Sequence, residues 1–101
     1  MCALNLTNNS RLFYGQIESE KINQIGKNLD LLFEIRENSS IYSPLAKQML
    51  AAFQQAGVGK FCLQVGKEYQ TRNNGEAAAP WFNRSCQFNE FEGCKSLLGQ
   101  W

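Results

Sequence analysis

Four cysteines carry the most distinctive chemistry of this chain, and they are Cys2, Cys62, Cys86 and Cys94. No two of them form a Cys-x-x-Cys motif, so neither a zinc knuckle nor a thioredoxin-like redox site is indicated. An even number of cysteines in a short chain favours disulfides, which persist in oxidising compartments. The alternative is four reduced thiols, partly buried as small apolar side chains.

The candidate disulfide joins Cys62 to Cys86. The Asn74-Gly75 pair is typical of a tight β-hairpin turn, and a turn centred on Asn74 places the two cysteines opposite each other. Opposed residues of antiparallel strands approach closely enough to be bridged. A longer loop would break this register. The alternative is a small local loop closed by Cys86 and Cys94, which are eight positions apart.

Cys2 has a further interpretation, as the lipid-bearing cysteine of a bacterial lipoprotein whose signal sequence has been removed. We favour an ordinary second residue or one half of a disulfide. The signals that precede a lipid-bearing cysteine are absent from this sequence.

The chain contains no histidine, which lowers the expectation of an enzyme. Histidine is the commonest general base and a frequent metal ligand. Neighbouring glutamates such as Glu34 and Glu37 are typical of a solvated face, because a catalytic pair needs two carboxyls held across a cleft. The segment 57–60 lacks the first glycine and the Ser or Thr of a phosphate-binding loop. We therefore predict no catalytic residue, no cofactor and no metal site.

The residues best suited to binding lie near the C-terminus, where aromatic side chains alternate with polar ones. Aromatic residues and arginine are enriched at the centres of protein–protein interfaces. The alternative is that most of these rings complete the core of a small domain. The candidate partner surface comprises Trp81, Phe82, Arg84, Phe88, Phe91 and Trp101.

The balance of charge argues against a nucleic-acid partner. Ten basic and nine acidic residues give a net charge of +1, and the two signs are mixed along the chain. Nucleic-acid binding needs a basic face or groove. No apolar run reaches the length of about 18 residues that a transmembrane helix requires, and no signal peptide is recognisable.

A helix over residues 43–57 is the element that the sequence predicts most strongly. Ser43 suits the N-cap, and Pro44 suits the first helical position. Gly57 suits the left-handed residue that closes a helix. Between them, apolar residues recur at spacings of three and four, as the buried stripe of a helix does. This stripe comprises Leu45, Met49, Phe53 and Ala56.

Four segments have the alternation or the composition of β-strands. They are residues 60–65, 29–37, 11–17 and 3–7. A helix followed at once by a strand folds back on the sheet that the strand joins. We therefore predict a single α+β domain over residues 1–101. It has a largely antiparallel sheet of four or five strands, with the 43–57 helix packed on one face. A short helix over 19–26 and a C-terminal helical turn are optional.

These features favour a non-enzymatic protein-binding module that works outside the cytoplasm, in the periplasm or secreted. A small inhibitor, an immunity protein or a secretion-accessory protein, held by one or two disulfides, would fit. One alternative is an intracellular adaptor or regulatory protein from a mobile element, with free thiols. A second is a small enzyme that uses carboxylates or a cysteine. Any of these forms could be a homodimer, the commonest form of soluble oligomer.

Overall fold

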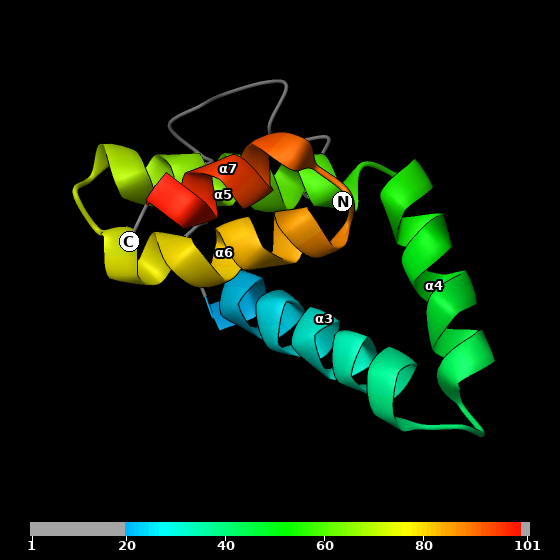
Figure 1. Ribbon diagram of the computed structural model, residues 1–101. Helices are drawn as coiled ribbons and strands as arrows, with labels where there is room; N and C mark the ends of the chain where they lie inside the picture. The colour runs from blue at the N-terminus through cyan, green and yellow to red at the C-terminus, as the bar shows by residue number, and fades with distance from the viewer. Residues whose placement is uncertain (1–19, 100–101) are drawn as a thin grey trace.

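The computed structural model describes residues 20–99, and this part of the chain forms five helices and no strand (Figure 1). The helices are α3 (Glu20–Asn38), α4 (Ser43–Gln55), α5 (Val58–Thr71), α6 (Gly75–Gln87) and α7 (Phe91–Gly99). The predicted α+β fold with a four- or five-stranded sheet is therefore wrong, because the described residues form a small helical bundle.

Helix α6 is central, since it packs against α3, α5 and α7. Helices α5 and α6 form an antiparallel hairpin, and α7 folds back along α6 (Figure 1). Helix α3 crosses below α6 in that view. Helix α4 stands apart at the edge of the molecule, where it contacts α3 at one end and α5 at the other. The chain thus builds a compact α5–α6–α7 unit and a more open α3–α4 hairpin.

The core is centred on side chains from α6 and from the turn that follows it. Phe82 and Phe88 are the largest fully buried side chains, with Val65 of α5 beside them in the same cluster. The ring of Phe33, from α3, meets Phe88 edge-on with 5.4 Å between ring centroids. Aromatic pairs in this geometry add attraction beyond their buried area. Rings from α3 and from the turn after α6 therefore join the two parts of the molecule.

Glycines of the neighbouring helices allow α6 to approach them closely. A Cβ added to Gly66 of α5 would come within 2.7 Å of the Phe82 ring. A Cβ added to Gly93 of α7 would overlap Ser85 Oγ. Real Cβ atoms do not approach other atoms so closely, and only glycine permits such backbone proximity. The buried face of α6 is therefore matched to small residues on its partners.

The turns at Gly57 and at Asn73-Asn74 lie where the sequence predicts turns, but they join helices. Gly57 has a φ of +93° and its N–H bonds the carbonyl of Gln54, so it closes α4 as predicted. Asn73 is also left-handed, with a φ of +60°. The Oδ1 atom of Asn74 accepts a hydrogen bond from the N–H of Ala77 at 3.2 Å. The Asn-Gly pair therefore starts α6 as an N-cap and does not form a β-turn.

The strand predicted over 29–37 is wrong because its short alternation hides a helical period. A strand would place Leu31 and Phe33 on the same face. Leu31 is instead 55% exposed, whereas Phe33 is 7% exposed. The buried residues of α3 recur at spacings of three and four, and they are Ile22, Gly26, Leu29 and Phe33.

The strand predicted over 60–65 is wrong for the same reason. It lies within α5, whose buried residues follow the helical period: Gly59, Cys62, Val65, Gly66 and Tyr69. The segments 3–7 and 11–17, also predicted as strands, lie outside the described residues.

The helix predicted over 43–57 is confirmed as α4, but a different face is buried. Ala46 and Leu50 are buried, while Leu45 and Met49 from the predicted apolar stripe are exposed. Ser43 does not cap the helix, and its Oγ donates to the carbonyl of Arg36 at 2.8 Å. Ser43 therefore ties the start of α4 to α3.

The two optional elements are longer than the sequence indicates. Helix α3 runs from Glu20 through Gly26 to Asn38, so Gly26 does not stop it. The C-terminal turn is the nine-residue helix α7. Both helices bury glycines against α6, and a local pattern gives no sign of that packing.

Candidate functional site

Arg84 of α6 is a buried charged residue, only 8% exposed. Its Nε and Nη2 atoms donate to the two carboxylate oxygens of Asp30 in α3, at 2.9 and 2.8 Å. Its guanidinium carbon lies 4.4 Å from the centroid of the Trp81 ring. A bidentate carboxylate pair and a cation–π contact both fix the plane of the guanidinium. Arg84 is therefore held in one orientation before any ligand arrives.

The close approach of α3 to α6 depends on Gly26. A Cβ added at this position would lie 2.6 Å from Nη1 and 2.7 Å from Cζ of Arg84. The guanidinium therefore lies directly against the α3 backbone, one helical turn before Asp30. The Arg84 head group is bounded by Gly26, Asp30 and Trp81.

One edge of the Arg84 guanidinium remains open. A guanidinium has five N–H donors in a planar fork, and Asp30 uses two of them. The remaining three belong to Nη1 and Nη2. Nη1 has no hydrogen-bond partner within residues 20–99. The open edge can therefore accept an oxyanion without disturbing the Asp30 pair.

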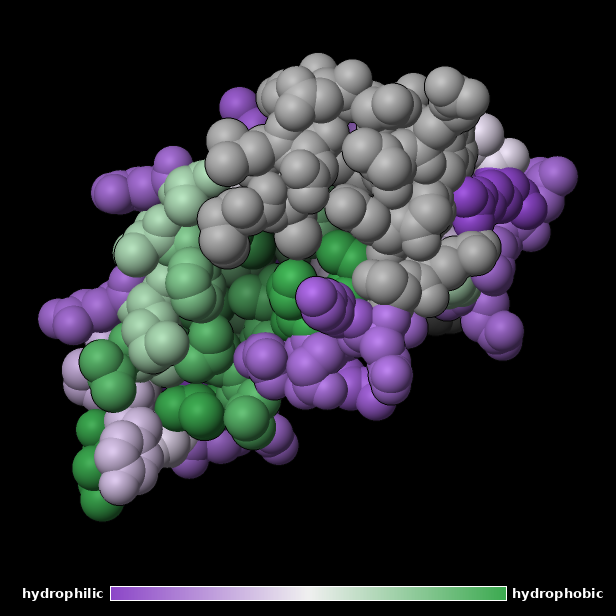
Figure 2. Space-filling view, turned by 180° about the vertical axis from the view of Figure 1, so that it is seen from behind, coloured by the Kyte–Doolittle hydropathy of each residue, from purple (hydrophilic) through white to green (hydrophobic). Residues whose placement is uncertain are grey.

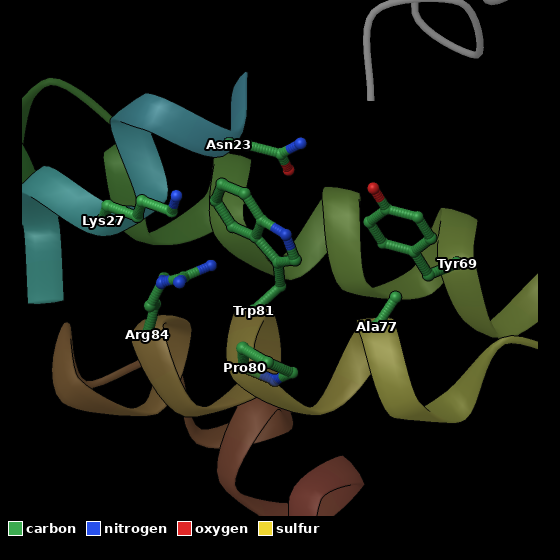
Figure 3. A pocket seen from close by; sticks show the side chains of 7 residues that line it. All are labelled: Asn23, Lys27, Tyr69, Ala77, Pro80, Trp81 and Arg84. Carbon is green, nitrogen blue, oxygen red and sulfur yellow. The ribbon is translucent and has the colours of Figure 1, made fainter. Parts of the chain in front are cut away.

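Arg84 lines a pocket of about 280 Å³ between α3, α5 and α6 (Figure 3). The lining residues are Asn23, Lys27, Tyr69, Ala77, Pro80, Trp81 and Arg84. Figure 3 shows the Lys27 and Arg84 side chains at one end of the pocket, beside the Trp81 indole. Lys27 forms no ion pair with another described residue. The pocket thus combines two cations at one end with an apolar wall.

The cysteines are paired differently from the candidate disulfide. Cys86 of α6 is bonded to Cys94 of α7, with 4.7 Å between their Cα atoms. Cys62 is a free and fully buried thiol that belongs to the core, so the Cys62–Cys86 pair is not formed. The hairpin register that opposed them does not exist, because both residues are helical. Cys2 lies outside the described residues.

Cys62 is unsuited to nucleophilic chemistry. Desolvation by burial raises the pKa of its thiol from 9.0 to about 12. The opposing effect of the nearby Arg84 charge is smaller. The thiolate is the nucleophilic form of cysteine. A thiol that stays protonated at neutral pH and has no exposed surface is a core residue.

The six residues of the candidate partner surface do not form one exposed surface. Three are buried in the core: Trp81, Phe82 and Phe88. Arg84 is also buried, although its open edge and one side of Trp81 reach the pocket. Phe91 lies on α7 and is 73% exposed. Trp101 lies outside the described residues.

Sequence reasoning singled out Trp81 and Arg84 but missed the residues that α3 contributes. Asn23, Lys27 and Asp30 are separated by four and three positions, which places them along one side of a helix. That signal was hidden because Asn23 fell in the optional helix over 19–26, whereas Asp30 fell in the predicted strand over 29–37. The 54 positions between Asp30 and Arg84 also make their pairing invisible to any local pattern.

The described residues contain neither a metal-ligand cluster nor a membrane-spanning helix. No three His, Cys, Asp or Glu residues between positions 20 and 99 are grouped to hold a metal ion. Within the same range, every helix is too short or too polar to cross a bilayer. No protein-family model, no curated protein and no solved structure matches this chain.

Proposed function

We propose that this protein is a non-enzymatic binding module whose partner is another protein. The observation that carries the proposal is an exposed apolar surface on the α3–α4 hairpin. Of the seven large hydrophobic residues exposed within the described range, five belong to α3, α4 or the turn between them. These five residues form the hairpin face: Leu31, Ile41, Tyr42, Leu45 and Met49.

Figure 2 presents the molecule from behind, and hydrophobic side chains gather there over α3 and α4. Ile41 is 78% exposed and Leu45 is 55% exposed, so these side chains lie on the surface rather than in a partly covered core. Single exposed apolar residues are ordinary, but a gathered patch marks a binding site on soluble proteins. The hairpin face has this gathered character.

Helix α4 carries apolar residues on two sides, which supports a contact beyond the bundle. Ala46 and Leu50 pack inward. Leu45 and Met49, each one position earlier, are exposed. A helix at the surface of a monomer usually has one apolar stripe and a polar remainder. A second apolar side is expected where a partner covers it.

The charge of α4 favours a protein over a membrane as this partner. Helices that lie in a bilayer interface carry several lysines or arginines on their polar side. Helix α4 carries a single charged residue, Lys47. A mixture of aliphatic side chains, methionine and tyrosine with few charges resembles the core of a protein–protein interface.

The non-enzymatic and extracytoplasmic parts of the proposal have separate support. The buried Cys62 thiol and the exposed Glu34 and Glu37 carboxylates offer no paired catalytic groups. The Cys86–Cys94 disulfide supports an oxidising compartment, because cytosolic thiols are kept reduced. An intracellular adaptor with free thiols fits less well.

Site-specific photo-crosslinking in the native host tests this proposal. A photoreactive phenylalanine derivative in place of Leu45 should give one discrete protein adduct. The same group in place of Gln48, an exposed polar position of the same helix, should not. The proposal would be wrong if the two positions gave the same adducts, or if position 45 gave none. An adduct of twice the chain mass identifies the partner as a second copy.

A further inference from the structure

We propose that the pocket lined by Lys27 and Arg84 binds a carboxylate monoanion that carries a small apolar group. The pocket shares no residue with the hairpin face, so this inference does not rest on the proposed function. It rests on a guanidinium edge and an ammonium group that have no partner among residues 20–99, and on an apolar wall in the same pocket.

The open guanidinium edge supplies the geometry. Asp30 binds the Nε–Nη2 side of Arg84, which leaves one N–H of Nη2 and both N–H groups of Nη1 without a hydrogen-bond partner among residues 20–99. Two parallel N–H groups match the two oxygens of a carboxylate. Because Asp30 and Trp81 already hold the guanidinium in place, little side-chain entropy remains to be lost on binding.

The charge of the pocket selects a monoanion. Asp30 neutralises Arg84, and Lys27 has no acidic partner among residues 20–99. The net charge that the described lining residues and Asp30 present to a ligand is therefore +1. A carboxylate brings one negative charge, whereas a phosphate monoester brings nearly two at neutral pH. The carboxylate leaves no uncompensated charge in this partly enclosed site.

The walls of the pocket select an apolar group beside the carboxylate. Ala77, Pro80 and the Trp81 ring line it along α6. Its volume of about 280 Å³ is at the low end of ligand pockets, which begin at about 300 Å³. A single ring or a short aliphatic chain fits such a space. An amino-acid side chain or a free aromatic acid has this size.

Pro80 is an independent sign that this wall is functional. It lies inside α6, where a proline removes one helical hydrogen bond and normally destabilises the helix. Local rules of this kind are broken mainly at functional or strained positions. The proline faces the pocket rather than a turn.

Titration of the disulfide-intact full chain with sodium benzoate, followed by ¹H–¹⁵N NMR, tests the inference. The chain has two tryptophans and four arginines, so the Trp81 indole and Arg84 Nε signals can be assigned by substitution. Both signals should shift saturably with benzoate. Lys27→Met keeps the apolar stem of an exposed side chain and should weaken binding at least tenfold. The control Lys47→Met, on α4, should leave binding unchanged.

Two short peptides that end in phenylalanine distinguish the source of the carboxylate. One peptide has a free C-terminus and the other has a C-terminal amide. Tighter binding of the free-acid peptide than of benzoate assigns a protein chain terminus as the ligand. Binding of benzoate without either peptide assigns a free small carboxylate.

Four results would overturn the inference. The first three are shifts that rise linearly without saturation, an amide peptide that binds as tightly as an acid peptide that itself binds, and unchanged binding in Lys27→Met. Inorganic phosphate that binds as tightly as benzoate would also overturn the inference, because the pocket would then not favour a monoanion over a more highly charged anion. The crosslinking experiment on the hairpin face does not bear on any of these outcomes.

Discussion

The guanidinium of Arg84 occupies the space that a side chain at position 26 would need, since a Cβ on Gly26 would lie 2.6 Å from Nη1. Gly26 lies in the middle of α3, where glycine is intrinsically poor. Its presence is explained by the position of Arg84 between the α3 backbone and the Trp81 ring. A residue that weakens its own helix thus permits the packing of two helices.

Gly26→Ala should therefore destabilise the protein, although alanine has a higher helix propensity than glycine. Alanine is favoured over glycine by about 1 kcal/mol in a helix interior. The displaced guanidinium should lose part of its bidentate contact with Asp30, so we expect a net loss of about 1–2 kcal/mol. Urea denaturation of both proteins measures this difference.

The Arg84→Ala background supplies the control for Gly26→Ala. Without the guanidinium, the added methyl group has no clash to make, so the same substitution should stabilise the chain by about 1 kcal/mol. A substitution that has the same sign in both backgrounds would show that Arg84 does not constrain position 26.

Asp30→Asn should be costly because it leaves the Arg84 charge unpaired. The Arg84 side chain is 9% exposed, whereas that of Asp30 is 51% exposed, so solvent offsets part of the loss. We expect about 1–2 kcal/mol, below the cost of breaking a fully buried pair. Chemical denaturation of wild type and Asp30→Asn measures this loss in the free energy of unfolding.

Glu37→Gln is the matched control for Asp30→Asn. Glu37 pairs with Arg36 at 3.0 Å, and its side chain is 66% exposed. Exposed pairs contribute little, and we expect a change within about 0.5 kcal/mol. Equal effects of the two substitutions would mean that the Asp30–Arg84 pair behaves as an ordinary surface ion pair.

The sequence correctly located the turns, because turn chemistry is local. Gly57 is needed for its left-handed φ, and Asn74 supplies its side-chain oxygen to the N–H of Ala77. Neither requirement depends on distant residues. The residues of a turn do not determine which type of element follows it. Asn-Gly at positions 74 and 75 can precede a helix as readily as a strand.

The sheet was predicted from short alternations of apolar residues, of which the segment 60–65 is one. Gly59 and Gly66 lower the helix propensity of α5, and a six-residue alternation between them fits a strand. In the fold, Gly66 admits the Phe82 ring and Gly59 admits Phe88. These are requirements of tertiary packing, which a local pattern does not contain.

The site was predicted only on its α6 side. Trp81 and Arg84 were identified because aromatic residues and arginine are typical of interfaces. Their partners Asn23 and Lys27 are ordinary polar residues on α3, and only the crossing of the two helices gives them a role. The hairpin face was missed because Leu45 and Met49 fitted an inward stripe equally well.

Reduction of the Cys86–Cys94 disulfide should lower the stability of the folded chain. The bond closes a loop between residues eight positions apart, at the junction of α6 and α7. Loop-closure entropy for so short a loop corresponds to about 2–3 kcal/mol. Urea midpoints with and without a phosphine reductant measure the loss. The reductant should not change the midpoint of Cys94→Ser, and an equal shift in both proteins would contradict the assignment.

The buried Cys62 thiol should make stability depend on pH in the alkaline range. Burial raises its pKa from 9.0 to about 12. Above pH 9 the unfolded chain loses this proton while the folded chain keeps it. The contribution of the protonated Cys62 thiol to the free energy of unfolding is therefore complete below pH 9, and it is lost as the pH rises towards 12. Between pH 8 and about 10.5, wild type should lose about 2 kcal/mol more than Cys62→Ala. Urea denaturation of both proteins at the two pH values measures this difference, and parallel pH dependences would mean that the native thiol is solvated.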